Sequence, residues 1–247
     1  MAIYLRENDY IRLLTEREHS VKELSEKLFI SEPTVRRDIR AMKEKGTVDC
    51  KRGIARLNPK SPDTRVPMFM RTLAHTEEKN EIARKCARHI KDGYTVMLDA
   101  STTAYSLLPV LSTFKNLFVI TNGAHTAISL AAMGIKTLSV GGEITPDSFC
   151  CLGAEAERTL ASYNADVAFF SCRGINEKGI ASDSTIPENE IRKIMMKNAK
   201  KSILLCDSSK FGLTFLHTLC HTSEVDEVIS DKPMPEYIGN DASPLGK

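Results

Sequence analysis

The sequence predicts an α/β fold in which helices cover both faces of a mainly parallel sheet, preceded by a small winged helix-turn-helix domain. From about residue 76 to residue 229, short apolar segments alternate with helical patterns, as in parallel sheets with crossover helices. The first 57 residues combine short helical patterns with a hairpin pattern. Between these parts, Pro59, Pro62 and Pro67 place three of the ten prolines within nine residues.

Length and composition exclude several classes of protein. A chain of 247 residues that is 42% hydrophobic and 27% charged forms one large or two unequal globular domains. No apolar run reaches the ~18 residues of a membrane span, and the first ten residues are too polar for a secretory signal. The seven cysteines include no CxxC pair, so we expect reduced, structural thiols in a cytoplasmic protein.

The first two helices are predicted from an apolar stripe and a capping signal. Residues 8–18 place their apolar side chains on one helical face. A second helix is expected after Ser20, because Ser20 and Glu23 have the spacing of an S-x-x-E capping box. Its buried face would consist of Val21, Leu24 and Leu28.

A third helix follows a short turn. Ser31 is expected to cap it, and Pro33 is tolerated in its first turn. Its apolar face has i, i+4, i+7 spacing and consists of Val35, Ile39 and Met42. The same spacing places four other side chains on the outer face of the helix, namely Thr34, Arg36, Arg37 and Arg40. Two short helices joined by a tight turn form a helix-turn-helix, whose second helix enters the major groove of DNA.

A basic hairpin is predicted after Gly46, which ends the third helix. Residues 47–50 and 54–57 can pair around Lys51-Arg52-Gly53 as a β-wing with two bases at its tip. Residues 34–56 hold eight bases and three acids, which makes this segment a candidate anion-facing patch. The alternative is that the small domain only supports the larger one.

The segment Ser31-Glu-Pro-Thr-Val-Arg-Arg-Asp-Ile39 resembles the helix-turn-helix signature of the DeoR family of bacterial transcription regulators. The wing departs from the family, which usually has a Gly-Gly pair where this chain has Arg52-Gly53-Ile54. The resemblance implies binding to double-stranded operator DNA. The residues expected to bind it are Ser31, Thr34, Arg36, Arg37, Arg40, Lys51 and Arg52.

These signals divide the chain into four parts. We expect the winged helix-turn-helix domain over residues 1–57 and a linker over 58–75, extended up to about residue 72. The larger domain would span 76–232, and an irregular tail would follow over 233–247.

The larger domain is predicted from alternating elements. Helices are expected over Glu78–Ile90, Ala104–Leu111, Gly123–Met133, Glu155–Tyr163 and Glu188–Ala199. Strands are expected over Thr95–Asp99, Leu117–Thr121, Lys136–Val140, Val167–Ser171, Ser202–Cys206 and Val225–Ser230. In such sheets, ligands bind outside the carboxyl ends of the strands.

Five of these strands end in small or polar residues. The segments are Asp99–Thr103, Thr121–Gly123, Gly141–Glu143, Ser171–Gly174 and Asp207–Gly212. Hydroxyl groups and glycines just before a helix suit an anion, because free N–H groups converge there. Lys210 would add a charge, and Asp99 would accept a sugar hydroxyl. Each loop alone is better explained by ordinary turn chemistry, but five of them at the same end of one sheet favour a binding site.

The same segments resemble the DeoR C-terminal sensor domain, and the resemblance covers about residues 3–231. Its motifs here are Lys79, Ile82, Ala83, Asp99-x-x-Thr-Thr103, Thr121-Asn122, Gly141-Gly142, Gly153, Asp166, Gly174, Gly179, Glu188 and Asp207-x-Ser-Lys-Phe211. That domain is similar in fold to ribose-5-phosphate isomerase and CoA transferases. The resemblance implies a phosphate at the threonine-rich loop and a sugar surrounded by Asp, Glu and Lys.

Two departures from the family pattern fall near this site. Ser101 replaces the usual glycine of Asp-x-Gly-Thr-Thr, and Ser171-Cys172 replaces a usual Gly-Ala pair. The expected effector-binding residues are Asp99, Ser101, Thr102, Thr103, Thr121, Asn122, Gly141, Gly142, Glu188, Asp207 and Lys210.

The resulting expectation is a transcriptional repressor of a sugar or sugar-alcohol catabolic operon, controlled by a phosphorylated sugar and assembled as a homodimer or homotetramer. One alternative is a sugar-phosphate isomerase, which needs a general base. Asp99, Glu143, Glu188 and Asp207 supply carboxylates, but no pattern marks one of them as that base. A second alternative is a regulator with a degenerate sensor. We expect no enzymatic activity, metal, organic cofactor or membrane partner.

Overall fold

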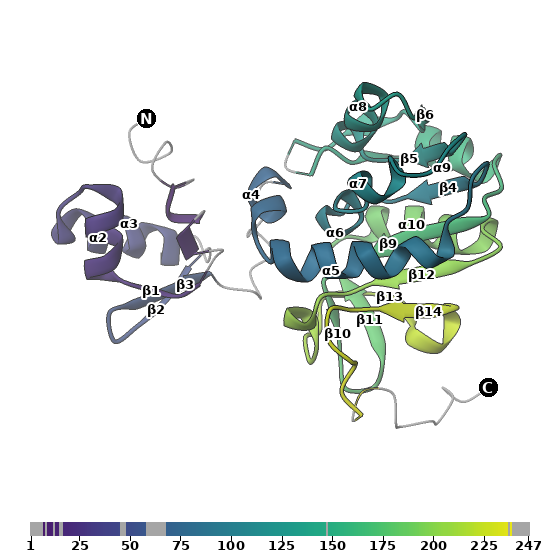
Figure 1. The fold of residues 1–247 in the computed structure, drawn as a ribbon. Coiled ribbons are helices and arrows are strands. Elements are labelled where there is room, and N and C mark those ends of the chain that lie inside the picture. The colour runs from purple at the N-terminus through teal and green to yellow at the C-terminus, as the bar shows by residue number, and fades with distance from the viewer. Residues whose placement is uncertain are drawn as a thin grey trace. The chain divides into compact units, whose positions relative to one another are not determined.

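The computed structural model describes residues 7, 9–11, 13–14, 17–44, 48–57, 68–146, 148–236 and 238. The chain divides into two compact units, Met1–Ala74 and His75–Lys247, each with its own core. Figure 1 shows both units as ribbons. Among the described residues, no helix is both long and apolar enough to cross a membrane.

The first unit is a winged helix-turn-helix. The two helices of this motif are α2 (Val21–Leu28) and α3 (Glu32–Glu44). The strands form an antiparallel sheet of order β1-β3-β2, with bounds His19–Ser20 (β1), Val48–Lys51 (β2) and Ile54–Leu57 (β3). The predicted helix-turn-helix and hairpin are confirmed, whereas the two-residue strand β1 was not predicted. Of the helix predicted over residues 8–18, residues 9–11 and 13–14 are helical, as is residue 7 before it, whereas residues 17 and 18 are not. Residues 8, 12, 15 and 16 lie outside the described residues.

Local chemistry explains where α2 begins and ends. The Glu23 backbone N–H donates to Ser20 Oγ at 3.1 Å, and the Ser20 backbone N–H donates to Glu23 Oε2 at 2.8 Å. This reciprocal pair is the predicted capping box. At the other end, Phe29 adopts a left-handed conformation with φ 54°, which stops the helix and turns the chain toward α3.

The hairpin between β2 and β3 closes through a two-residue turn. Arg52 and Gly53 both have positive φ, 52° and 77°, as a type I′ turn requires. Lys51 therefore pairs with Ile54 at the end of the ladder. The turn holds its basic residues at the tip of the wing.

The prediction of an extended linker over residues 58–72 is wrong at its C-terminal end. Met68–Leu73 form helix α4. This sequence contains neither proline nor glycine, so nothing in it opposes a helical turn once the proline run has ended. Residues 58–67 lie outside the described residues.

The second unit is built on a six-stranded parallel sheet of order β14-β12-β9-β4-β5-β6. Its strands are Thr95–Leu98 (β4), Phe118–Thr121 (β5), Lys136–Ser139 (β6), Val167–Ser171 (β9), Ser202–Leu205 (β12) and Glu227–Ile229 (β14). Each corresponds to a predicted strand. The prediction of an α/β fold with a parallel sheet is confirmed.

Helices cover both faces of this sheet. Their bounds are Thr76–Cys86 (α5), Thr102–Tyr105 (α6), Leu108–Leu111 (α7), Ala124–Ala132 (α8), Ala154–Ala161 (α9) and Ile186–Asn198 (α10), with a 3-10 turn, η1, over Ala87–His89. Val96, Leu98 and Phe169 face a core that includes α5, which lies in front of the sheet in Figure 1. Met97 and Phe170, which alternate with them, face the core of α9 and α10.

Several features of this unit were not predicted. The predicted helix over 104–111 is divided into α6 and α7, because Pro109 has no N–H with which to continue a helix from α6. A second, antiparallel sheet of order β10-β11-β13 joins Gly174–Ile175 (β10), Ile180–Asp183 (β11) and His217–His221 (β13), and a small hairpin joins Glu143–Ile144 (β7) to Cys151–Leu152 (β8). A further 3-10 turn, η2, spans Ser208–Lys210.

Candidate functional site

Helix α3 presents arginines on its outer face. Arg36, Arg37 and Arg40 are exposed and Thr34 is half-buried, as the helical spacing predicts. Arg36 Nη2 lies 3.1 Å from Glu32 Oε2 one turn earlier. Among the described residues, Arg37 and Arg40 have no such partner, so their charges are available to an external anion. Ser31 Oγ lies 3.0 Å from Thr34 Oγ1 at the start of the helix.

The acidic residue within the same motif points the other way. Asp38 is 2% exposed, and Tyr10 Oη donates to its Oδ2 at 3.2 Å. The motif therefore separates its charges, with Asp38 held in the core of the unit and the arginines outside. This leaves the outer face of α3 positively charged.

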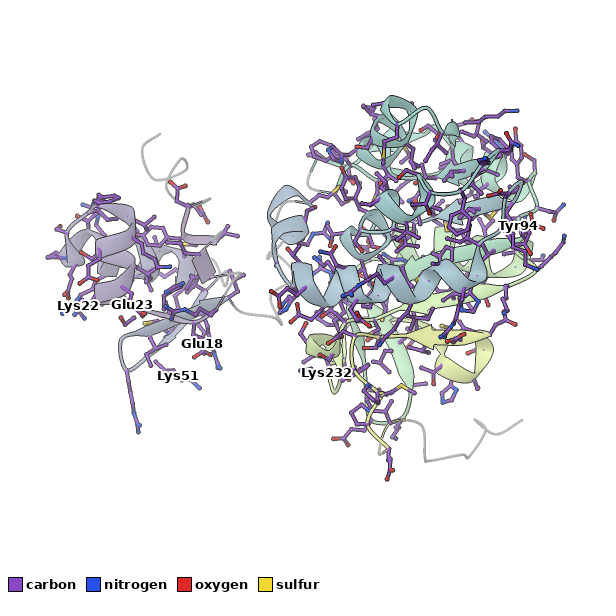
Figure 2. All side chains as sticks on the ribbon, in the orientation of Figure 1. Glu18, Lys22, Glu23, Lys51, Tyr94 and Lys232 are labelled. Atoms are coloured by element: carbon purple, nitrogen blue, oxygen red, sulfur yellow. The ribbon has the colours of Figure 1, made fainter. Side chains whose placement is uncertain are left out.

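The wing carries a second group of bases. Lys51 and Arg52 are exposed, and within the described part of the chain neither forms an ion pair. Arg56, in contrast, is held by Asp49 at 3.2 Å and Glu18 at 3.5 Å. Figure 2 labels Lys51 on this hairpin. We call Arg36, Arg37, Arg40, Lys51 and Arg52 together the basic surface.

In the second unit, Asp99 follows β4 and is 1% exposed. Its Oδ1 accepts bonds from the Ser101 backbone N–H at 3.1 Å and from Ser101 Oγ at 2.6 Å. Its Oδ2 accepts from the Ser171 backbone N–H at 3.2 Å and from Arg192 Nε at 3.0 Å. Four donors fill the lone pairs of this carboxylate. Asp99 therefore fixes the loops around it.

Arg192, on α10, joins three carboxylates and was missed by the sequence reasoning. It is 6% exposed. Besides Asp99, it contacts Asp183 through Nη1 at 2.8 Å and Glu188 through Nη2 at 3.3 Å. Burial lowers the pKa of Arg192, but the three carboxylates outweigh burial and raise it well above its usual range. Its i, i+4 spacing from Glu188 was the available signal in the sequence.

Lys210 forms a second centre. Its Nζ donates to Ser171 Oγ at 3.0 Å and to Thr103 Oγ1 at 3.3 Å, and lies 3.2 Å from Asp207 Oδ2. Burial raises the pKa of Asp207, but Lys210 and Ser209 outweigh burial and lower it to about 2. These three contacts use all three protons of the ammonium group.

The two centres form one connected group. Ser171 links them, because its N–H donates to Asp99 and its Oγ accepts from Lys210. We call this group the polar network, and it consists of Asp99, Ser101, Thr103, Ser171, Asp183, Glu188, Arg192, Asp207 and Lys210. It lies at the carboxyl ends of β4, β9 and β12, where the fold places ligands.

The neighbouring loops hold the other predicted residues. Thr121 Oγ1 accepts from the Gly123 backbone N–H at 3.0 Å. Asn122 is 2% exposed, and its Oδ1 finds no donor among the described residues. Gly142 has φ 100°, and a Cβ there would lie 2.4 Å from the Leu152 carbonyl oxygen. No hydrogen bond joins Thr121, Asn122, Gly141 or Gly142 to the polar network among the described residues.

Comparison with known proteins gives a consistent result for both units. Residues 6–61 match the description "DeoR-like helix-turn-helix domain", and residues 74–232 match "DeoR C terminal sensor domain". The transcriptional regulator GolR of Listeria innocua is 32% identical over 94% of this chain and 91% of its own length. The L-fucose operon activator of Escherichia coli is 30% identical over 89% of this chain and 91% of its own length. The glycerol-3-phosphate regulon repressor of the same bacterium is 28% identical over 93% of this chain and 91% of its own length.

Solved structures resemble the chain in fold. The translation initiation factor eIF-2B of Pyrococcus horikoshii has a TM-score of 0.51 at 13% identity, over 91% of this chain and 86% of that one. Ribose 5-phosphate isomerase A of Methanocaldococcus jannaschii has a TM-score of 0.42 at 18% identity, over 56% of this chain and 55% of that one. At 13% identity, the likeness to the initiation factor concerns the fold alone.

Proposed function

The chain belongs to the DeoR family of transcriptional regulators, and we propose that it represses a sugar or sugar-alcohol catabolic operon in response to a phosphorylated sugar. The observation that carries the proposal is the basic surface, whose Arg37 and Arg40 lack partners among the described residues. Relatives include both a repressor and an activator, and the repressor is our choice. A regulator of this kind acts where bacterial DNA is, in the cytoplasm.

The first part of the proposal concerns DNA. Helix α3 enters the major groove, where Thr34 and Arg37 lie nearest to base edges. Arg36, Arg40 and Arg52 divide their contacts between bases and phosphates, with Arg52 on the phosphates, and Ser31 and Lys51 also contact the backbone. The ion pair between Arg36 and Glu32 supports placing Arg37 nearer to the bases than Arg36, because Arg36 must break that ion pair before it can bind DNA.

The second part concerns the effector. We place its phosphate at Thr102, Thr103 and Lys210, where the ammonium group can exchange its longest contact, Thr103 Oγ1 at 3.3 Å, for a phosphate oxygen. The four donors on Asp99 argue against our expectation that it accepts a sugar hydroxyl, so we assign it a positioning role. Glu188, whose side chain is 21% exposed, takes over as the hydroxyl acceptor. The remaining predicted residues, Ser101, Thr121, Asn122, Gly141, Gly142 and Asp207, shape the site.

The effector assignment is tested by thermal unfolding with matched pairs of sugars and sugar phosphates. A bound sugar phosphate stabilises the fold by about 2.7 kcal/mol at a hundred times its dissociation constant, and the unphosphorylated sugar does far less. K210A should abolish the shift and leave DNA binding intact, with K200A, at an exposed lysine, as the control. T103V tests the same contact without removing the charge. An equal shift with the unphosphorylated sugar would refute the phosphate site.

The enzyme alternative has less support. The relatives named above are regulators, and an isomerase needs a carboxylate that is free to take a proton. Glu188 and Asp207 are instead paired with Arg192 and Lys210. Incubation with ribose 5-phosphate should give no ketose phosphate, and turnover that K210A abolishes would favour the isomerase.

A further inference from the structure

Cys172 and Cys206 directly follow two neighbouring parallel strands. In the register of β9 and β12, Ser171 lies opposite Leu205, so the two cysteines are the next pair along the sheet. Both side chains belong to the core on the α10 face, as do Phe170 and Leu204 two positions earlier. Adjacent strands lie about 4.8 Å apart, within the ~4.4–6.8 Å between the Cα atoms of a disulfide. The backbone therefore permits a cross-link here.

The chemistry of the two thiols differs. The neighbouring Cys206 thiol lowers the pKa of Cys172 against the effect of burial, and the charge of Lys210 lowers it further. The Cys172 thiol, together with burial, raises the pKa of Cys206, whose Sγ donates to the Asp207 carbonyl oxygen at 3.7 Å, well above its usual range. Cys172 keeps a 3% exposed fraction, whereas Cys206 has none. Cys172 is therefore the nucleophile of the pair.

The other cysteines of this unit lack that environment. Cys151 lies on β8, which pairs with β7 and not with a strand that carries a cysteine. Burial raises the pKa of Cys150 to about 12, and burial together with Cys172 raises that of Cys220 to about 12. Cys86 lies in the core on the opposite face of the sheet, where burial raises its pKa. The Cys172–Cys206 pair is thus the one set apart by both placement and charge.

We propose that Cys172 and Cys206 form a peroxide-responsive thiol pair at the edge of the polar network. The Cys172 thiolate attacks one oxygen of hydrogen peroxide, the O–O bond breaks, and the leaving hydroxide takes a proton to become water. Cys206 then attacks the sulfenic sulfur, the S–S bond forms, and a second water leaves. Two thiols lose two electrons and two protons, and one peroxide becomes two waters.

The cross-link would act on Lys210. Ser171 precedes Cys172, Asp207 follows Cys206, and both residues hold the Lys210 ammonium group. Drawing the sulfurs to the ~2.05 Å of a disulfide moves these neighbours and disturbs the Lys210 contacts. This consequence rests on the proposed function: the sugar phosphate that raises the melting temperature of the reduced protein should raise that of the cross-linked protein by less than half.

The pair is tested by mapping disulfides in the full-length protein. The reduced protein is treated with hydrogen peroxide, blocked with N-ethylmaleimide and digested with trypsin without reductant. Cys172 and Cys206 lie in the separate tryptic peptides 159–173 and 202–210, each with one cysteine. Cys220 lies in the peptide 211–247, because trypsin does not cleave between Lys232 and Pro233. We expect 159–173 linked to 202–210, and the link should disappear with dithiothreitol.

Variants separate the pair from general oxidation. C206A should stop the reaction at the sulfenic acid of Cys172, and C86A should leave the cross-link unchanged. K210M should slow its formation at least threefold at pH 7; because this variant loses the tryptic site at residue 210, its digest also includes chymotrypsin, which cleaves after Phe211 and keeps Cys206 apart from Cys220. No cross-link, or one from Cys172 to Cys220, overturns the proposal. A cross-link that leaves the sugar-phosphate shift unchanged overturns the coupling to Lys210, whereas the absence of any shift in the reduced protein contradicts the proposed function instead.

Discussion

At the scale of single residues, the buried pair of Asp207 and Lys210 makes a prediction about acid stability. The folded pKa of Asp207 is about 2, below its ordinary value of 3.8, so the folded protein binds that proton more weakly than the unfolded chain. The pair's stabilisation is complete above pH ~4–5 and is lost as the pH falls from 3.8 through 2. The difference corresponds to about 2 kcal/mol.

D207N should therefore lower the free energy of unfolding by about 2 kcal/mol at pH 7 and by progressively less as the pH approaches 2. Urea unfolding of both proteins across this range checks the prediction. The control is E190Q, whose carboxylate pairs with Lys193 on the surface. A D207N deficit that stays constant from pH 7 to pH 2 would rule out an electrostatic origin.

Arg37 carries the residue-scale prediction for DNA. It is exposed on α3 and unpaired among the described residues, so R37A should cost ~1–3 kcal/mol in operator binding and relax the preference at one base pair. R158A, on the second unit, is the control. Binding titrations against the operator and its single-base variants measure both effects. Unchanged affinity and preference would remove Arg37 from the base-reading role.

Functional residues could be predicted from the sequence where they belong to one short motif. The outward arginines of α3 follow from helical spacing alone, and the structure places them as expected. Arg192 was missed because it lies in an amphipathic helix, and only the fold brings it to Asp99 and Asp183. The role of Asp99 was not predictable either, since its donors come from Ser101, Ser171 and Arg192, across 93 residues of sequence.

At the scale of elements, the wing should contribute electrostatics without sequence preference. Its tip holds Lys51 and Arg52 on a type I′ turn. The double variant K51Q/R52Q should weaken binding to all DNA sequences alike and reduce the slope of log affinity against log salt by up to ~2. Titrations at several salt concentrations test this. A loss confined to the operator would mean that the wing reads bases.

The predicted elements show why some were found and others were not. The central strands are continuous apolar runs that alternate with helices, a pattern visible without tertiary structure. Strands β10, β7 and β8 have two residues each, too short to show any periodicity. Helix α4 was missed because the preceding prolines suggested extended backbone beyond their own positions.

At the scale of the whole molecule, we expect a dimer or tetramer assembled through the second unit. One winged helix covers a short half-site and competes poorly against the excess of nonspecific DNA. Symmetric oligomers solve this by binding two half-sites. Light scattering on residues 75–247, the second compact unit, should give at least twice the monomer mass at micromolar concentration. Only monomer would place the assembly elsewhere.

The central claim is that one chain joins operator binding to sugar-phosphate sensing. Fluorescence anisotropy of the full-length protein on DNA from upstream of its own gene, with a scrambled duplex as control, tests it most directly. We predict preference for the upstream DNA, and a shift in that affinity with one phosphorylated sugar but not its unphosphorylated form. Equal affinity for both duplexes, or an affinity that no sugar phosphate changes, would contradict the account.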